Sequence, residues 1–432
     1  MRRIITGWLD HSVVSESSET NYFGCVMTKL TVILLSVLSL IVVACSPGQP
    51  MTEKKPEEGV PAKTLPPNTV PTQTLASERS EQPPFGAQGE FRTDFSITSV
   101  PFDQIISGGP PKDGIPSIDN PRYETIQSAD DWLDDAEPVI AVSVNEIARA
   151  YPIQVLMWHE IVNDTLADLP LVVTFCPLCN TAIGYQRQLD GRLLEFGTTG
   201  RLRFSNLIMY DRQTESWWQQ ATGEAIVGEL TGEALAVHPV AMVAWSDFKS
   251  RCPQGDVLSR ETGYQRPYGQ NPYSGYDDIN RPPLLYEGPA TPGVLSPLAR
   301  VLTVEINAQA VAYPYTELEV RGAINDVVGG EPIVVFWTSG AVSALDRPAV
   351  AGGRDVGAAV AYSRSLNEQT LDFTLQDGVI TDLQTGSSWD IFGHAVDGEL
   401  SGSALVQLPA VNHFWFSWAA FKPETRVFGQ ME

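Results

Sequence analysis

The sequence has few basic residues and few cysteines, and the apolar run near its start is too short to span a bilayer comfortably. Its 432 residues include 28 Lys and Arg against 52 Asp and Glu, which gives a formal net charge of -24. This acidic excess argues against nucleic acid or an anionic lipid surface as a partner, because both carry the same sign of charge. Hydrophobic residues still make up 43% of the chain, which is ample for buried cores. The length predicts two or three domains.

The start of the chain predicts an exported, lipid-anchored protein. An apolar run over residues 32–44 follows Met27 and a lysine, and it ends directly before Cys45. A short apolar run that closes on a small residue and a cysteine resembles a bacterial lipoprotein signal. The resemblance implies that Cys45 is lipidated and anchors the protein at the extracytoplasmic face of the cell membrane or envelope. The alternatives are a plain secretory signal or one buried helix.

Three stretches are not expected to belong to the folded part. Residues 1–26 are polar and precede a second methionine, so we expect an upstream mis-start, with translation beginning at Met27 and a signal peptide over 27–44. Residues 45–89 are rich in Pro, Thr, Ser and Glu and have almost no aromatic residue. Such a stretch cannot bury enough surface to offset its ordering entropy. We therefore predict a disordered tether over 45–89 and expect the function to lie after residue 90.

The remaining chain contains an internal duplication. Ala150-Tyr-Pro152 recurs as Ala312-Tyr-Pro314, and Pro170-Leu-Val-Val173 recurs as Pro332-Ile-Val-Val335, each after 162 residues. Self-similarity at so long a period indicates duplicated domains rather than a solenoid of short units. The predicted boundaries are 90–260 for copy one, 261–295 for an inter-copy segment and 296–432 for copy two.

Short strands and turns dominate the pattern of both copies. In copy one, alternation over residues 139–151 around a turn at Asn145 predicts a hairpin, and Pro152 suits the first position of a short helix. Asp190-Gly191 is a strong two-residue hairpin signal, and residues 243–251 predict a closing helix. The predicted fold class is α+β, mostly antiparallel β, in two tandem related copies.

The candidate site is built around Cys176-Pro-Leu-Cys179, which follows a buried apolar run. Two thiols at this spacing can close a redox disulfide, form a structural disulfide or hold one metal ion. The residues after the second cysteine predict a turn into a strand rather than a thioredoxin-like helix. A metal-binding knuckle needs a left-handed residue there, and Asn180 accepts that conformation.

A knuckle supplies two thiolates, so a four-ligand metal site must take others from His159, His238 or Cys252. Thiolates with imidazoles suit zinc or copper better than calcium or magnesium. The internal repeat places the site in copy one, because its ligand residues are replaced in copy two. The offset pairs His159 with Arg321, Cys176 with Thr338 and Cys179 with Ala341, and the shared prolines pair His238 with Leu408.

The inter-copy segment carries five tyrosines, at 264, 268, 273, 276 and 286. We expect it either to cover the copy-one site as an aromatic wall or to form a packed belt between the copies. Glu160, beside His159, is a potential general base, although an exposed glutamate is the commoner explanation.

Three motifs carry a resemblance to a known family: His159-Glu-Ile-Val-Asn-Asp164, Val173-Thr-Phe-Cys-Pro-Leu-Cys179 and Met209-Tyr-Asp211. They resemble DUF3179, a family of exported bacterial and archaeal proteins of unknown function, over about residues 96–429. The resemblance implies no activity. Relatives that carry Thr in place of the second cysteine imply that Cys176 and His159 act together, as metal ligands or as an activated nucleophile.

The sequence thus predicts an extracytoplasmic, lipid-anchored protein that binds zinc or copper through Cys176, Cys179, His159 and His238. One alternative is an enzyme in which Cys176 is a redox or nucleophilic thiol and His159 is its base. The other alternative is a non-catalytic module that binds a ligand or a protein.

Overall fold

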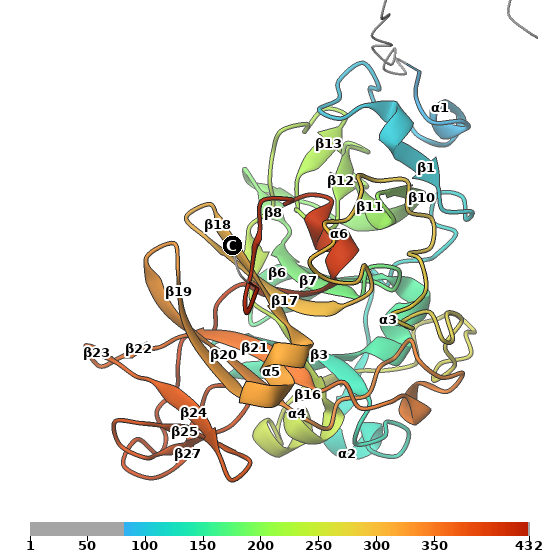
Figure 1. Ribbon diagram of the computed structural model, residues 1–432. Coiled ribbons are helices and arrows are strands. Elements are labelled where there is room, and N and C mark those ends of the chain that lie inside the picture. Colours follow the sequence, from blue (N-terminus) through green and yellow to red (C-terminus); the bar gives the residue numbers. More distant parts are fainter. Residues whose placement is uncertain (1–81, 431–432) are drawn as a thin grey trace, which may run out of the picture. The chain divides into compact units, whose positions relative to one another are not determined.

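The computed structural model of the protein describes residues 82–430 (Figure 1). The predicted signal peptide, Cys45 and most of the predicted tether lie outside these residues. The folded part begins slightly earlier than predicted, because Ala87 is fully buried and packs with Phe91. Within the described range, no helix is both long enough and apolar enough to cross a membrane.

The described part of the chain opens with short elements and continues into a long first series. The opening elements are α1 (Ala87–Glu90), the 3-10 helix η1 (Phe102–Gln104), β1 (Ile105–Ser107), β2 (Tyr123–Thr125) and α2 (Ile126–Ala129). The first series comprises β3 (Pro138–Val144), β4 (Ile147–Pro152), α3 (Ile153–His159), β5 (Ile161–Leu166), β6 (Leu169–Cys176), β7 (Thr181–Gln186), β8 (Gln188–Leu189), β9 (Arg192–Leu193), β10 (Phe196–Arg203), β11 (Asn206–Asp211), β12 (Trp217–Gln219), β13 (Ala225–Val227), β14 (Val237–His238), β15 (Ala241–Ala244), α4 (Trp245–Arg251) and β16 (Asp256–Leu258).

A second series follows an irregular segment over residues 259–299. It comprises β17 (Arg300–Ile306), β18 (Gln309–Pro314), α5 (Tyr315–Arg321), β19 (Ala323–Val328), β20 (Glu331–Thr338), the 3-10 helix η2 (Val350–Gly352), β21 (Ala358–Ser363), β22 (Ser365–Leu366), β23 (Gln369–Thr370), β24 (Phe373–Gln376), β25 (Val379–Asp382), β26 (Ser388–Trp389), β27 (Ala395–Asp397), β28 (Ala410–Phe414), α6 (Trp415–Ala419) and β29 (Arg426–Val427).

The two series share nearly the same order of strands and helices, although the second has no strand equivalent to β14 and adds η2. In the first, the sheets run β15-β3-β4-β16-β2, β14-β7-β6-β5 and β1-β10-β11-β12-β13. In the second, they run β28-β17-β18-β29, β19-β20-β21 and β24-β25-β26-β27. Nearly all neighbours are antiparallel, but β16 pairs with β4, and β29 pairs with β18, in parallel. The fold is therefore mostly antiparallel β, with helices of only four to seven residues.

Local sequence signals set most element boundaries, and tertiary pairing moved two of them. The Asp190-Gly191 hairpin is confirmed, with both residues at positive φ between β8 and β9. The closing helix was predicted from residue 243, but α4 begins at Trp245 because Ala241–Ala244 pairs with β3 instead. Pro152 lies at the N-cap of α3 rather than at its first helical position.

The closing elements of each series pack into the core of the other series. One core cluster combines Trp245 and Phe248 of α4 with Phe336 of β20. Another combines Phe416 of α6 with Phe175 of β6. Accordingly, β15 lies against β21 and β28 lies against β7, and Figure 1 shows the red helix α6 among the green strands of the first series. This reciprocal exchange brings residues near the end of the chain to the CxxC motif.

Candidate functional site

The two thiols lie at the end of β6, in a tight buried turn. Cys176 is the last residue of β6, and the Cys179 amide donates to its carbonyl at 3.2 Å. Asn180 has a φ of 51°, which confirms the left-handed residue predicted after the second cysteine. The exposed fractions are 2% for Cys176 and 0% for Cys179. Both cysteines are free, so the structural disulfide considered as an alternative is not formed here.

A network of donors makes the two thiols unequal. Burial, and then the neighbouring Cys179, raises the pKa of Cys176 well above its ordinary value. Burial also opposes ionisation of Cys179, but the neighbouring polar groups of Cys176, Ser417 and Asn206 outweigh it and lower the pKa of that thiol. Cys179 is therefore the first of the two thiols to lose its proton as pH rises.

Three polar groups lie beside the two sulfurs. The Asn206 amide donates to the Cys179 sulfur at 3.5 Å, and the Ser205 carbonyl lies 3.4 Å from that sulfur and 3.9 Å from Cys176. The carbonyl thus accepts from whichever sulfur is protonated. The Ser417 hydroxyl faces Cys179 and has no hydrogen-bond partner, so it can donate to a thiolate there.

Glu160 is the charged neighbour of the thiols. It caps the C-terminus of α3, and only 7% of its surface is exposed, which corrects the expectation of an exposed glutamate. Burial and, after it, the charge of Cys176 raise the pKa of this carboxyl well above its ordinary value. Burial therefore favours the neutral form of this carboxyl, which sits close enough to the thiols for their charges to interact.

The backbone of Glu160 favours glycine rather than glutamate. Its φ is 58°, in the left-handed region, which costs a residue with a side chain about 1–2 kcal/mol. The equivalent cap of α5 is Gly322, with a φ of 63°. Both caps donate their N–H to the carbonyl four residues earlier, so the local geometry is the same. A glutamate held where glycine fits best points to a role for its side chain.

His159 is buried but does not serve the thiols. Its Nδ1 lies 2.7 Å from the Pro116 carbonyl, so Nδ1 carries the proton and donates it. Its Nε2 lies 2.7 Å from the Tyr268 hydroxyl and accepts from it. Burial lowers the pKa of the ring, which keeps it neutral. The predicted pairing of His159 with Cys176 is not formed, because both ring nitrogens are taken by other partners.

The predicted set of metal ligands is not assembled either. His238 lies on β14 at the edge of the sheet, and its Nε2 contacts the Ser143 carbonyl at 3.1 Å. Cys252 is half-buried at the C-cap of α4. Over residues 82–430, no three or more His, Cys, Asp or Glu side chains group to hold a metal ion. Residue type alone suggested these ligands, whereas packing placed the histidines elsewhere.

The tyrosine-rich segment covers this region. The Tyr276 hydroxyl donates to the Leu178 carbonyl, between the two cysteines, at 2.8 Å. The next residue, Asp277, is buried and pairs with Arg300 at 2.8 Å and Arg354 at 2.9 Å, which pins the segment to the second series. Burial raises the pKa of Tyr273, and the charges of Glu160 and Cys176 add to it. The segment therefore forms one wall of the thiol site and also joins the two series.

Sequence reasoning missed the distant members of the site. Asn206 and Ser417 carry no motif, and Ser417 reaches Cys179 only because α6 packs against the first series. A role for Glu160 could have been found in the sequence, because the 162-residue offset pairs this glutamate with Gly322. These two residues differ in chemistry as much as Cys176 and Thr338 do.

Fold and site together define a mostly antiparallel β protein with a buried thiol pair beside a buried carboxyl. Residues 112–425 match the family described as protein of unknown function DUF3179, so the chain belongs to that family. No curated protein and no solved structure matches the chain.

Proposed function

We propose that the chain is an extracytoplasmic, lipid-anchored thiol redox protein in which Cys176 and Cys179 pass between a dithiol and a disulfide. The closeness of two free, buried sulfurs carries this proposal, because both lie against the Ser205 carbonyl, at 3.9 Å for Cys176 and 3.4 Å for Cys179, and the pKa of Cys179 is lowered by its neighbours. A thiolate beside a second thiol can attack a disulfide and then resolve the mixed disulfide. Since both sulfurs are buried, we expect the co-reactant to be a small disulfide.

The proposed reaction balances with one disulfide as the oxidant. The Cys179 thiolate attacks one sulfur of that disulfide, a mixed disulfide forms, and the first leaving thiolate takes a proton. Cys176 then loses its proton and attacks the Cys179 sulfur, which expels the second thiolate. Two electrons pass from the protein sulfurs to the small disulfide. The second thiolate takes up from solvent the proton that Cys179 released when it ionised, so the products are two thiols.

Glu160 is proposed as the proton carrier for both steps. Its raised pKa favours the protonated carboxyl, which can donate to the first leaving thiolate. The carboxylate left behind can accept the proton of Cys176, which restores the starting state. Its position on the capped end of α3 fixes it beside the thiols, as general acid–base catalysis requires.

Binding of monovalent copper is the second candidate function. Soft thiolates select monovalent copper as well as zinc. Closed zinc sites generally need four ligands, and the described part of the chain does not assemble them. Two thiolates can hold monovalent copper without a histidine. The specific observation that favours it is the contact of two sulfurs in a site that excludes water.

The proposal also covers where the protein is anchored and how its two series are related. The apolar run before Cys45 supports export with a lipid anchor, and the composition of residues 45–89 supports a tether. The shared element order and the constant offset support two copies of one domain, with copy one over 90–260 and copy two over 296–432. The thiol site belongs to the first copy, completed by α6 of the second.

A redox titration of the detergent-extracted full chain tests the thiol function. We expect equilibration with mixtures of reduced and oxidised dithiothreitol to give a reversible two-electron transition above about -300 mV. Trapping free thiols with an alkylating reagent and weighing the protein gives the oxidised fraction. The transition should vanish in Cys176→Ser and Cys179→Ser and persist in Cys252→Ser. Thiols that stay reduced in every buffer, or a disulfide that dithiothreitol leaves intact, would rule out this function.

Copper binding needs a separate anaerobic titration of the reduced chain against a dye that chelates monovalent copper. One ion bound per chain, lost in Cys176→Ser but retained in His159→Ala, is the expected result for the second candidate. Loss of the ion in His159→Ala would instead favour the histidine-containing site predicted from the sequence.

A further inference from the structure

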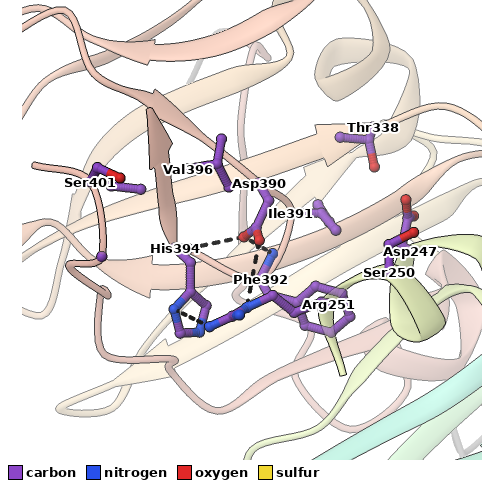
Figure 2. Close-up of a pocket in the computed structure, with 12 residues that line it drawn as sticks. Asp247, Ser250, Arg251, Thr338, Asp390, Ile391, Phe392, His394, Val396 and Ser401 are labelled. Carbon is purple, nitrogen blue, oxygen red and sulfur yellow. Dashed lines mark hydrogen bonds and ion pairs between the residues drawn. The ribbon is translucent and has the colours of Figure 1, made fainter. Parts of the chain in front are cut away.

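A cavity of about 640 Å³ lies away from the thiols, between α4 of the first series and strands of the second (Figure 2). Figure 2 shows polar side chains of α4 and of the β26–β27 connection facing it. The residues that matter to its chemistry are Asp247, Arg251, Thr338, Asp390, Phe392 and His394.

This cavity occupies the place in the second series that the thiols occupy in the first. Thr338 ends β20 as Cys176 ends β6. Asp247 is the third residue of α4, as Ser417 is the third residue of α6. The exchange of closing helices therefore builds two related sites, and the second has Thr338 where the first has Cys176.

Two polar atoms at this cavity are buried and lack a hydrogen-bond partner. They are Asp247 Oδ2 and Thr338 Oγ1. A buried polar group without a partner costs about 1–3 kcal/mol, so such groups are rarely kept unless something binds them. Both atoms belong to residues that line the cavity, so a rotation of either side chain would present its polar atom to a ligand there.

The charged groups at the cavity neutralise one another. Arg251 Nε lies 3.7 Å from Asp390 Oδ2, and the guanidinium donates to His394 Nδ1 at 2.6 Å. Asp390 Oδ1 accepts from the backbone amides of Phe392 and His394. Because His394 Nδ1 accepts, its Nε2 carries the ring proton and can donate. Burial, helped by the charge of Asp390, raises the pKa of Asp247 to about 6.

A second cavity of about 640 Å³ adjoins the first and shares Arg251, Phe392 and His394 with it. Gln407 lines this second cavity, and its buried Nε2 has no partner. The two cavities make one groove, which the Arg251–His394 pair and the Phe392 ring divide. An elongated ligand with hydroxyls along its length meets acceptors, donors and an apolar ring in turn.

We propose that this groove binds a neutral, polyhydroxylated ligand, an oligosaccharide, through Asp247, Thr338 and Gln407, with Phe392 packing on a sugar ring. Hydroxyl groups both donate and accept, which matches the mixture of free groups on the walls. A strongly anionic ligand would meet Asp247 and Asp390, and a cationic ligand would meet Arg251. The proposal is independent of the redox chemistry proposed for the thiols.

Calorimetric titration of the detergent-extracted full chain with maltotriose, cellotriose and chitotriose tests the proposal. At least one of these neutral trisaccharides should bind with a saturable isotherm. Thr338→Val should weaken that binding about tenfold, because the hydroxyl contact is lost while the shape of the side chain is kept. Thr338→Ser, which retains the hydroxyl, should bind nearly as well as the unchanged chain.

Cys176→Ser is the matched control at the related thiol site and should leave the affinity unchanged. The absence of saturable binding by all three trisaccharides up to about 10 mM would overturn the proposal. Binding that is equally tight in Thr338→Val would also overturn the proposal. That variant is expected to fold normally, because the hydroxyl it removes has no hydrogen-bond partner.

Discussion

The ends of β6 and β20 hold the same position in the two series but serve different chemistry. At the first, Cys176 and Cys179 are buried, with a carboxyl, an amide and a hydroxyl beside them. At the second, Thr338 borders a polar cavity. The shared fold supplies the strand end and the helix that crosses from the other series. The side chains placed on this common frame decide what each site can do.

The helix caps beside these sites differ in the same way. Gly322 adopts the left-handed conformation with no steric cost, whereas Glu160 adopts it at a cost in stability. Fold alone does not call for a glutamate here. The comparison therefore separates residues that build the frame from residues that give one site its chemistry.

Replacement of the Glu160 carboxyl should give the largest effect. We expect Glu160→Gln to slow oxidation of the thiol pair by a small disulfide about a hundredfold or more at neutral pH, because the amide cannot relay protons. Stopped-flow mixing with rapid thiol quenching measures this rate. The control is Glu137→Gln, since Glu137 is another buried carboxyl whose pKa is raised, to about 7. A Glu160→Gln rate within twofold of the unchanged chain would remove Glu160 from the reaction.

Substitutions at the two helix caps should change the free energy of unfolding in opposite directions. Gly322→Ala should lower the free energy of unfolding by about 2 kcal/mol, because its Cβ would adopt a left-handed conformation and meet Leu375 at 2.7 Å. Glu160→Gly should raise it by about 1 kcal/mol, as backbone strain and a buried carboxyl are both removed. Urea unfolding of each variant gives these values. A loss of stability in Glu160→Gly would contradict the assignment of strain to that cap.

The stability of the protein should depend on pH through Asp247, at the cavity of the second series. The pKa of Asp247 is raised from 3.8 to about 6, so the folded chain holds this proton over a range in which the unfolded chain has released it. Stability should therefore fall as pH rises from about 4 to about 6. Allowing for solvent screening of this partly exposed group, the fall should be about 1–2 kcal/mol.

In Asp247→Asn, the loss of stability that Asp247 causes between these pH values should be absent. Urea unfolding of both proteins at several pH values gives the difference between their free energies of unfolding. Other acids with a raised pKa contribute equally to both proteins and cancel in this difference. A constant difference between the two proteins across this range would mean that Asp247 is not held neutral by the cavity.

Local chemistry let the sequence predict much of the fold and the centre of the site. Alternating residues predicted the strands, Asp190-Gly191 predicted a hairpin, and Asn180 predicted the left-handed residue after the cysteines. These features depend on neighbours in the chain, so they can be found without knowing how distant parts pack. The same holds for the family motifs around Cys176.

Only the tertiary structure decided which residues surround the thiols. His159 ends α3, in the motif that the sequence placed beside the thiols, yet its ring is engaged by Pro116 and Tyr268. Ser417 comes from the far end of the chain, yet it faces Cys179. The Ser417 contact depends on the exchange of closing helices between the series, in which aromatic side chains are buried across both cores. Residue type and spacing indicated a reactive thiol pair, and packing determined that a carboxyl, rather than an imidazole, stands beside it.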